Sequence, residues 1–135
     1  MIVFDKDRIG PWVCARTGGT YEGSTSSAIG LEKDGELLSG VLYDNYNGRS
    51  VCMHVAAVPG KRWLTREYLR VAWDYPFNQL KVNQVIGMVD SKNMDARRFD
   101  EHLGFKLAAV IPDAGKTGDL MIYTMHRSEC RWLEK

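Results

Sequence analysis

A histidine able to move protons lies inside an apolar run, and two basic residues follow that run. His54 stands within residues 51–58, which are otherwise almost continuously apolar. Histidine changes charge near neutral pH, so His54 is a candidate base, and the alternative is a half-buried imidazole bonded to backbone. Asp44 lies in the preceding turn, where Asp is also favoured for backbone reasons. Lys61 and Arg62 precede a predicted helix, where they either bind an anion or are solvated charges.

The cysteines do not predict a metal site or a disulfide framework. Cys14, Cys52 and Cys130 are odd in number and far apart, and the histidines show no ligand-like spacing with them. We therefore predict free thiols and no metal. Residues 114–117 superficially resemble part of a P-loop, but the motif's first glycine position holds Val110 and a strand follows, so ATP or GTP binding is rejected.

The composition predicts one soluble globular domain over residues 1–135. Hydrophobic residues make up 44% and charged residues 26% of the chain, and the formal net charge is +1. A charge so close to zero argues against nucleic acid or a membrane surface as partner, so any anion site must be local. There is no signal-peptide core and no apolar run long enough to span a membrane, and we expect a cytoplasmic location.

The hydrophobic pattern alternates strands with helices. Apolar runs and turn signals predict strands at 28–33, 36–43, 51–58, 85–89, 105–111 and 119–125.

Two of these strands flank Asp34-Gly35, a pair that favours a type I′ hairpin. The helical period predicts one helix over 64–75, stopped by Pro76, and another that carries Ala96, Phe99 and Leu103 and ends before Gly104. We therefore predict an α/β fold whose mixed, mostly antiparallel central sheet contains a βαβ crossover and is flanked by helices.

The N-terminal part of the pattern is less regular. Residues 7–16 predict a short helix in spite of Gly10-Pro11, because proline is tolerated in a first turn. A polar loop follows over residues 17–27.

The segment from Val89 to Phe105 resembles the signature of the GNAT N-acetyltransferases. In that family a strand ends in a polar turn with Asn, Ala follows three residues later, and Leu-Gly-Phe closes the next helix. The matching residues are Asn93, Ala96, Phe99, Leu103, Gly104 and Phe105. The order of elements from Ala28 to Met125 also fits, and residues 62–66 and 74–77 are similar to compact members encoded by phages and prophages.

The resemblance implies transfer of an acetyl group from acetyl-CoA to a primary amine, by direct attack in a ternary complex. It implies a GNAT-like acyl-CoA N-acyltransferase fold in which two parallel strands splay and the pantetheine arm pairs with the first of them. The residues implied in binding acetyl-CoA are Val55, Ala56, Ala57, Gly60, Lys61, Arg62, Trp63, Leu64, Thr65, Asn93, Ala96 and Phe99. His54 is the candidate base toward the amine, and the acceptor is a small molecule or a protein.

The sequence departs from the family pattern in two places. The phosphate loop at 59–65 is short and has one glycine, and Asp100 stands where many members carry the Tyr that protonates the leaving thiolate. Tyr123 and Tyr75 are alternative acids. These departures motivate a second reading, an inactive GNAT-fold module that binds CoA or another protein, and Trp132 is a candidate core cap or homodimer contact.

Overall fold

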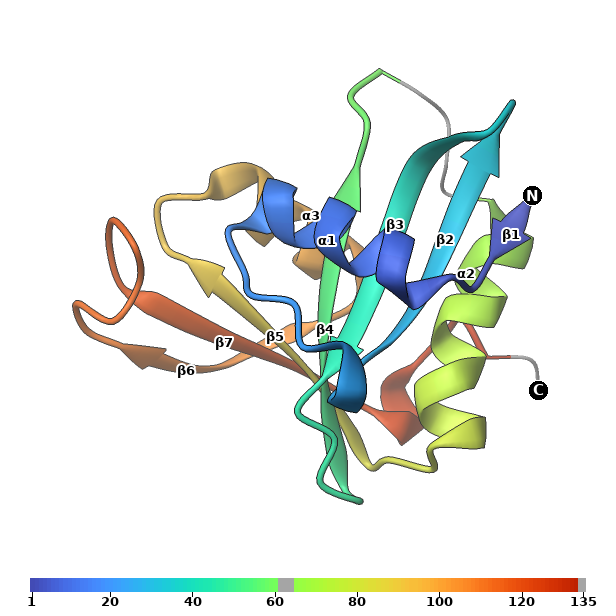
Figure 1. Cartoon of the computed structure of the whole chain (residues 1–135). Coiled ribbons are helices and arrows are strands. Elements are labelled where there is room, and N and C mark those ends of the chain that lie inside the picture. Colours follow the sequence, from blue (N-terminus) through green and yellow to red (C-terminus); the bar gives the residue numbers. More distant parts are fainter. Residues whose placement is uncertain (61–64, 134–135) are drawn as a thin grey trace.

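A computed structural model describes residues 1–60 and 65–133 as a seven-stranded sheet with helices on both faces (Figure 1). The sheet order is β1-β2-β3-β4-β5-β7-β6. The strands are β1 (Ile2–Val3), β2 (Ser27–Lys33), β3 (Glu36–Asp44), β4 (Ser50–Ala57), β5 (Gln84–Asp90), β6 (Lys106–Ile111) and β7 (Leu120–His126). The helices are α1 (Lys6–Thr17), α2 (Arg66–Asp74) and α3 (Met94–Leu103). The predicted mixed sheet is confirmed, and β1 is a short strand that the sequence pattern did not indicate.

The predicted hairpin joins β2 and β3. Asp34 has φ 53° and Gly35 has φ 80°, the left-handed pair that a type I′ turn requires. Beyond the turn the two strands pair from Lys33 opposite Glu36 to Ser27 opposite Tyr43. The Asp-Gly signal therefore predicts the turn, and the pairing of the two strands shifts at an irregularity between Leu31 and Glu32.

The crossover through α2 makes β4 and β5 parallel neighbours that separate along their length. They pair only from Ser50 opposite Gln84 to Cys52 opposite Ile86. Beyond this point β4 stays paired with β3 and β5 stays paired with β7, so the two strands diverge (Figure 1). The sheet is thus open between the second halves of β4 and β5.

The α-helix α2 ends at Asp74, close to the predicted end, but the chain keeps winding beyond it. The predicted helix over 64–75 is observed from Arg66, with Thr65 as its N-cap, and helical winding passes through Pro76 as a π-helical turn over Tyr75–Gln79. Proline lacks the N–H that would bond to the carbonyl of Ala72 four residues earlier. The buried Tyr43 hydroxyl donates to that carbonyl instead. Tertiary packing therefore compensates for a local helix-breaking signal.

Helix α1 is longer than predicted and places Pro11 in its middle rather than in its first turn. Ile9 and Val13 are fully buried on either side of the proline, against the face of the sheet formed by β2, β3 and β4. This burial outweighs the lost backbone hydrogen bond. The helix ends at Gly18, which has φ 79°.

Helix α3 ends before Gly104, as its sequence predicts, and its N-cap is Asn93. The Asn93 side chain accepts the N–H of Ala96 at 3.2 Å, and Gly104 ends the helix with φ 108°.

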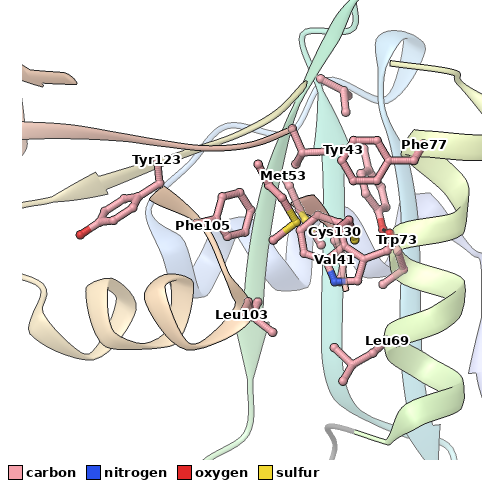
Figure 2. Packing of buried hydrophobic residues seen from close by; sticks show 14 of the residues in the cluster. Val41, Tyr43, Met53, Leu69, Trp73, Phe77, Leu103, Phe105, Tyr123 and Cys130 are labelled. Carbon is pink, nitrogen blue, oxygen red and sulfur yellow. Dashed lines mark hydrogen bonds between the residues drawn. The ribbon is translucent and has the colours of Figure 1, made fainter. Parts of the chain in front are cut away.

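Two hydrophobic clusters lie on the two faces of the sheet. The smaller contains Ile9 and Val13 of α1, and the larger packs α2 and α3 against the other face. Figure 2 shows the larger cluster, where Trp73 lies between the rings of Phe77 and Phe105 with centroid distances of 6.0 and 5.5 Å. Trp73 and Phe77 are therefore core residues. None of the helices in the described residues is long and apolar enough to cross a membrane.

Candidate active site

A cavity of about 900 Å³ opens where β4 and β5 separate. Its walls come from the C-terminal end of α1, from β4, β5 and α3, and from the loop between β6 and β7. The predicted site residues that line it are His54, Val55, Ala56, Ala57, Asn93, Ala96 and Phe99. The divergence of two strands thus gathers residues from distant parts of the chain around one space.

The second half of β4 presents backbone groups to this cavity. Val58 donates its N–H to the carbonyl of Leu38 at 2.8 Å, on the β3 side. Donors alternate between the two edges of a strand, so the N–H groups of Val55 and Ala57 point to the side from which β5 has departed. Ala56 lies opposite Gly40 and turns its backbone groups toward β3. Val55 and Ala57, rather than Ala56, therefore offer the donors at the open edge.

His54 forms a pair with Asp44. Its Nε2 lies 2.9 Å from Oδ1 of Asp44, and the two side chains are 23% and 19% exposed. A carboxylate only accepts hydrogen bonds, so Nε2 carries the proton and Nδ1 of the neutral ring is left as an acceptor. Asp44 is the last residue of β3 rather than a turn residue, and it lies opposite Cys52 in the ladder. This pair can orient the imidazole as a base.

Asp100 is a half-buried carboxyl group in the same cavity. It lies against Gly87 of β5, where a Cβ atom would be only 3.1 Å from Oδ2. Burial is the larger cause that raises the pKa of Asp100 to about 7, and the neighbouring charge of Glu101 adds to it. The carboxyl group is thus protonated in a large fraction of molecules at neutral pH.

His54 and Asp100 approach the cavity from opposite faces of the sheet. His54 is two residues from Ala56, which packs in the cluster with α1, so both side chains leave the same face of β4. Val85, Gly87 and Val89 are two residues apart along β5, so they face the same side of the sheet. Val85 and Val89 pack in the cluster with α2 and α3, and Gly87 therefore lies on that face. The gap between β4 and β5 therefore connects a base on one face with a carboxyl group on the other.

The two tyrosines predicted as alternative acids are bound elsewhere. The Tyr123 hydroxyl donates to Oε2 of Glu101 at 2.6 Å, and in Figure 2 it points away from the packed cluster. Burial and this bond raise the pKa of Tyr123. The Tyr75 hydroxyl donates to Oγ of Ser27 at 2.6 Å. Neither tyrosine lines the cavity.

The predicted phosphate loop is described only at its two ends. Lys61, Arg62, Trp63 and Leu64 lie outside the described residues. Gly60 has φ 75°, and the Thr65 hydroxyl accepts the N–H of Tyr68 at 3.1 Å to begin α2. Neither Gly60 nor Thr65 lines the cavity between the strands.

A second cavity, of about 910 Å³, lies between the start of α2 and the end of α3. Its lining includes Arg66 and Arg70 of α2 and Arg131 of the C-terminal segment. Sequence analysis did not select Arg66 or Arg70 as site residues. Arg131 is brought to them by the fold, which no spacing in the sequence could indicate.

The loop between β6 and β7 is fixed over the first cavity by contacts that sequence analysis missed. Asp90 accepts the N–H groups of Thr117 at 2.7 Å and Lys92 at 2.9 Å, and these bonds lower the pKa of Asp90. Lys116 donates from Nζ to the carbonyl of Gly18 at 2.8 Å. The loop therefore joins the end of β5 to the end of α1.

The remaining reactive groups of the described chain are three thiols and the side chains that could bind a metal ion. Cys14, Cys52 and Cys130 are free, and burial is the main cause that raises the pKa of each. Among the residues at 1–60 and 65–133, no three Cys, His, Asp or Glu side chains cluster in a way that could hold a metal ion.

Comparison with known proteins identifies the fold. No protein-family model and no curated protein sequence matches the chain. A mutant of spermidine N-acetyltransferase SpeG from Vibrio cholerae matches with a TM-score of 0.76 and 14% identity, over 95% of each chain. A dodecameric structure of that enzyme in an intermediate state matches with a TM-score of 0.72 and 16% identity, over 95% of this chain and 94% of the other.

A probable acetyltransferase also matches, with a TM-score of 0.65 and 21% identity, over 78% of this chain and 64% of the other. Identities this low establish the architecture alone. The chain therefore has the fold of the GNAT acetyltransferases.

Proposed function

We propose that this protein is an N-acetyltransferase that moves an acetyl group from acetyl-CoA to a primary amine by direct attack in a ternary complex. The observation that carries the proposal is the open edge of β4 inside a cavity that reaches both faces of the sheet. Such an opening lets a thioester and an amine approach each other from opposite sides. The reaction forms an amide and releases the coenzyme as a free thiol.

The open strand edge supports the assignment of the donor substrate. The N–H groups of Val55 and Ala57 are suited to pair with the amide groups of a pantetheine arm, as one strand pairs with another. The same donors would stabilise the thioester oxygen as it gains negative charge. Asn93, Ala96 and Phe99 would form the opposite wall. Acetyl-CoA is a substrate in this scheme, and no metal takes part in it.

The phosphates of acetyl-CoA are assigned to the start of α2. The free N–H groups there and the helix dipole favour anions. Residues 60–65 would supply the loop, and Arg66 and Arg70 of the second cavity would supply local positive charge in a chain whose net charge is only +1.

We assign the role of general base to His54. In this assignment Nδ1 takes the proton of the attacking amine, while Asp44 holds the ring through Nε2 and stabilises the positive charge that forms. Asp44 acts through His54 and is therefore a positioning residue.

The acceptor is an amine of a small molecule or of a protein. SpeG is by its title a spermidine N-acetyltransferase. A polycationic acceptor calls for concentrated negative charge, but cationic and acidic side chains are balanced in the described lining of this cavity. They are Arg16, Lys92, Lys116, Asp90, Asp95 and Asp100. We therefore do not transfer the acceptor of SpeG to this chain.

We place the protein in the cytoplasm, and we retain the resemblance to compact phage-encoded members as part of the proposal.

The test measures the release of coenzyme A thiol from acetyl-CoA across a broad panel of amines. We expect amine-dependent release by the wild type. His54→Ala should lower kcat about 100-fold at neutral pH. The loss should shrink above pH 9, where more of the amine is already unprotonated.

His126→Ala is the matched control, because this half-buried histidine is hydrogen-bonded to nearby Ser128 and does not line the cavity. Binding of acetyl-CoA without release above the hydrolysis background, for every amine, would favour the inactive-module reading instead.

A further inference from the structure

We propose that Asp100 is the general acid of the reaction, giving its carboxyl proton to the sulfur of coenzyme A as the thioester bond breaks. This proposal rests on the acetyltransferase function proposed above.

The position of Asp100 carries the proposal. Its carboxyl group lines the cavity and lies against Gly87, the first residue of β5 beyond the paired part of β4 and β5. The lack of a Cβ at Gly87 leaves room for the carboxyl group, since a Cβ there would meet Oδ2 at 3.1 Å. The acid is thus on the α3 face of the opening, and His54 is on the α1 face.

Among the described residues, no tyrosine or cysteine lines the cavity as an alternative acid to Asp100. All six tyrosines lie in the described part of the chain, and none of them lines this cavity. Each hydroxyl is bound elsewhere: Tyr21 to Asp7, Tyr43 to Ala72, Tyr46 to Leu80, Tyr68 to Ser39, Tyr75 to Ser27 and Tyr123 to Glu101. No cysteine lines the cavity either.

The surroundings of Asp100 keep its proton available at neutral pH. Within the described residues, no group donates a hydrogen bond to its carboxylate, so burial acts without compensation and raises its pKa to about 7. On its own helix, Glu101 is the charged group that acts on it. On β5 and at the start of β6 it meets Gly87 and the ring of Phe105, which carry no charge. On β7, Tyr123 is bound to Glu101 and lies near Arg97.

The proton balance of the step is complete. The amine nitrogen forms a bond to the carbonyl carbon, and the carbon–sulfur bond breaks. The Asp100 proton goes to the sulfur, while the amine proton goes to His54 and from there to water. Asp100 then takes a proton from water before the next turnover. The reaction needs no co-reactant beyond acetyl-CoA and the amine.

The first test uses Asp100→Asn, which keeps the size of the side chain but has no proton to give. We expect kcat to fall about 100-fold or more, with little change in the KM for acetyl-CoA. The kcat of the wild type should decline as the pH rises above about 7, and this alkaline decline should be absent in the variant. Gly87→Ala, which displaces the carboxyl group but leaves it in the chain, should also lower kcat.

The second test needs no turnover. With ¹³C-labelled carboxyl groups, NMR of the ligand-free wild type should show one carboxyl group that titrates near pH 7 and is missing from Asp100→Asn. Asp34→Asn is the matched control, since it lies in the distant β2–β3 turn, where Asn-Gly also favours type I′ geometry. It should keep both the wild-type activity and this titration.

The outcomes separate the two proposals. Full activity of Asp100→Asn with an unchanged alkaline decline, or no carboxyl group titrating near pH 7 in the wild type, overturns the role of Asp100 and leaves the acetyltransferase proposal standing. A wild type that neither binds acetyl-CoA nor releases its thiol overturns both.

Discussion

Asp90 and Asp100 line the same cavity, but their carboxyl groups have opposite surroundings. Asp90 accepts three backbone N–H groups, at 2.7, 2.9 and 3.3 Å, and these lower its pKa. Asp100 is half-buried beside Gly87, and burial raises its pKa to about 7. One aspartate is therefore a structural anchor for a loop, whereas the other holds a proton at a cost in stability.

This cost predicts that Asp100→Asn stabilises the protein at alkaline pH. A carboxyl group whose pKa is higher in the folded state makes the protein less stable as the pH rises. The loss occurs between the pKa of about 4 in the unfolded chain and the pKa of about 7 in the folded protein, and no more stability is lost above that pH. The rise from 3.8 corresponds to at most about 4 kcal/mol, less the solvation that a half-buried group keeps. Urea unfolding should show the variant more stable than the wild type at pH 8, with a difference that shrinks toward pH 5.

The matched control is again Asp34→Asn. Two results would contradict the uncompensated burial of Asp100. One is a gain in the free energy of unfolding that changes with pH in Asp34→Asn as it does in Asp100→Asn. The other is a difference in stability between wild type and Asp100→Asn that does not change with pH.

The sequence indicated some of these residues and not others. Gly104 could be predicted as the residue that ends α3, because the end of a helix is a local feature of the sequence. The pairing of His54 with Asp44 depends on the register of β3 against β4. The protonation of Asp100 depends on its approach to Gly87, which no sequence motif records. Side-chain chemistry set by contacts between distant segments therefore lay beyond sequence analysis.

At the scale of elements, the separation of β4 from β5 is what makes a site. Three paired positions hold the strands together, and the remaining part of β4 keeps its ladder with β3. The apolar runs predicted both strands, and the helix between them predicted their parallel direction. The extent of the opening was implied only by the resemblance, because periodicity does not tell where two strands stop pairing.

The open edge predicts different effects for proline at two adjacent positions. Val55→Pro removes an N–H that faces the cavity, so the ladder with β3 should persist while binding of acetyl-CoA weakens about tenfold through the loss of one hydrogen bond. Ala56→Pro removes an N–H that faces β3 and should destabilise the fold. Calorimetric titration with acetyl-CoA and thermal unfolding would measure the two effects. Equal loss of stability in both variants would refute the assigned edge.

The α-helix α2 ends at Asp74, next to its predicted end, but Pro76 does not stop the helical winding. Pro76 is a sound local signal that a helix stops. The hydroxyl of Tyr43, far away in the sequence, satisfies the carbonyl that the proline leaves without its partner. Helical winding therefore continues to Gln79.

At the scale of the whole molecule, one end of the sheet is exposed and apolar. β6 is an edge strand that extends with β7 away from the rest of the sheet (Figure 1), and Leu107, Val110 and Ile111 are 48%, 46% and 47% exposed. An edge of this kind favours pairing with another strand. We propose that a second copy of this chain covers it, because identical edges can pair antiparallel about a twofold axis.

Light scattering after size-exclusion chromatography tests this dimer. We expect twice the monomer mass of 15.3 kDa for the wild type and the monomer mass for Val110→Lys. Lys33→Glu, at the distant hairpin, is a control that should remain dimeric. A monomeric wild type at high concentration would contradict the proposed pairing.

The acetyltransferase proposal is tested most simply by the thermal shift that acetyl-CoA causes, compared with the shifts caused by CoA and ATP. A ligand at 100 times its Kd adds roughly 2.7 kcal/mol to the free energy of unfolding, which is readily measured as a rise in Tm. We expect a clear rise in Tm with acetyl-CoA and CoA but not with ATP, and a smaller rise in Val55→Pro. No shift at millimolar acetyl-CoA would leave the fold standing and contradict the acetyltransferase function.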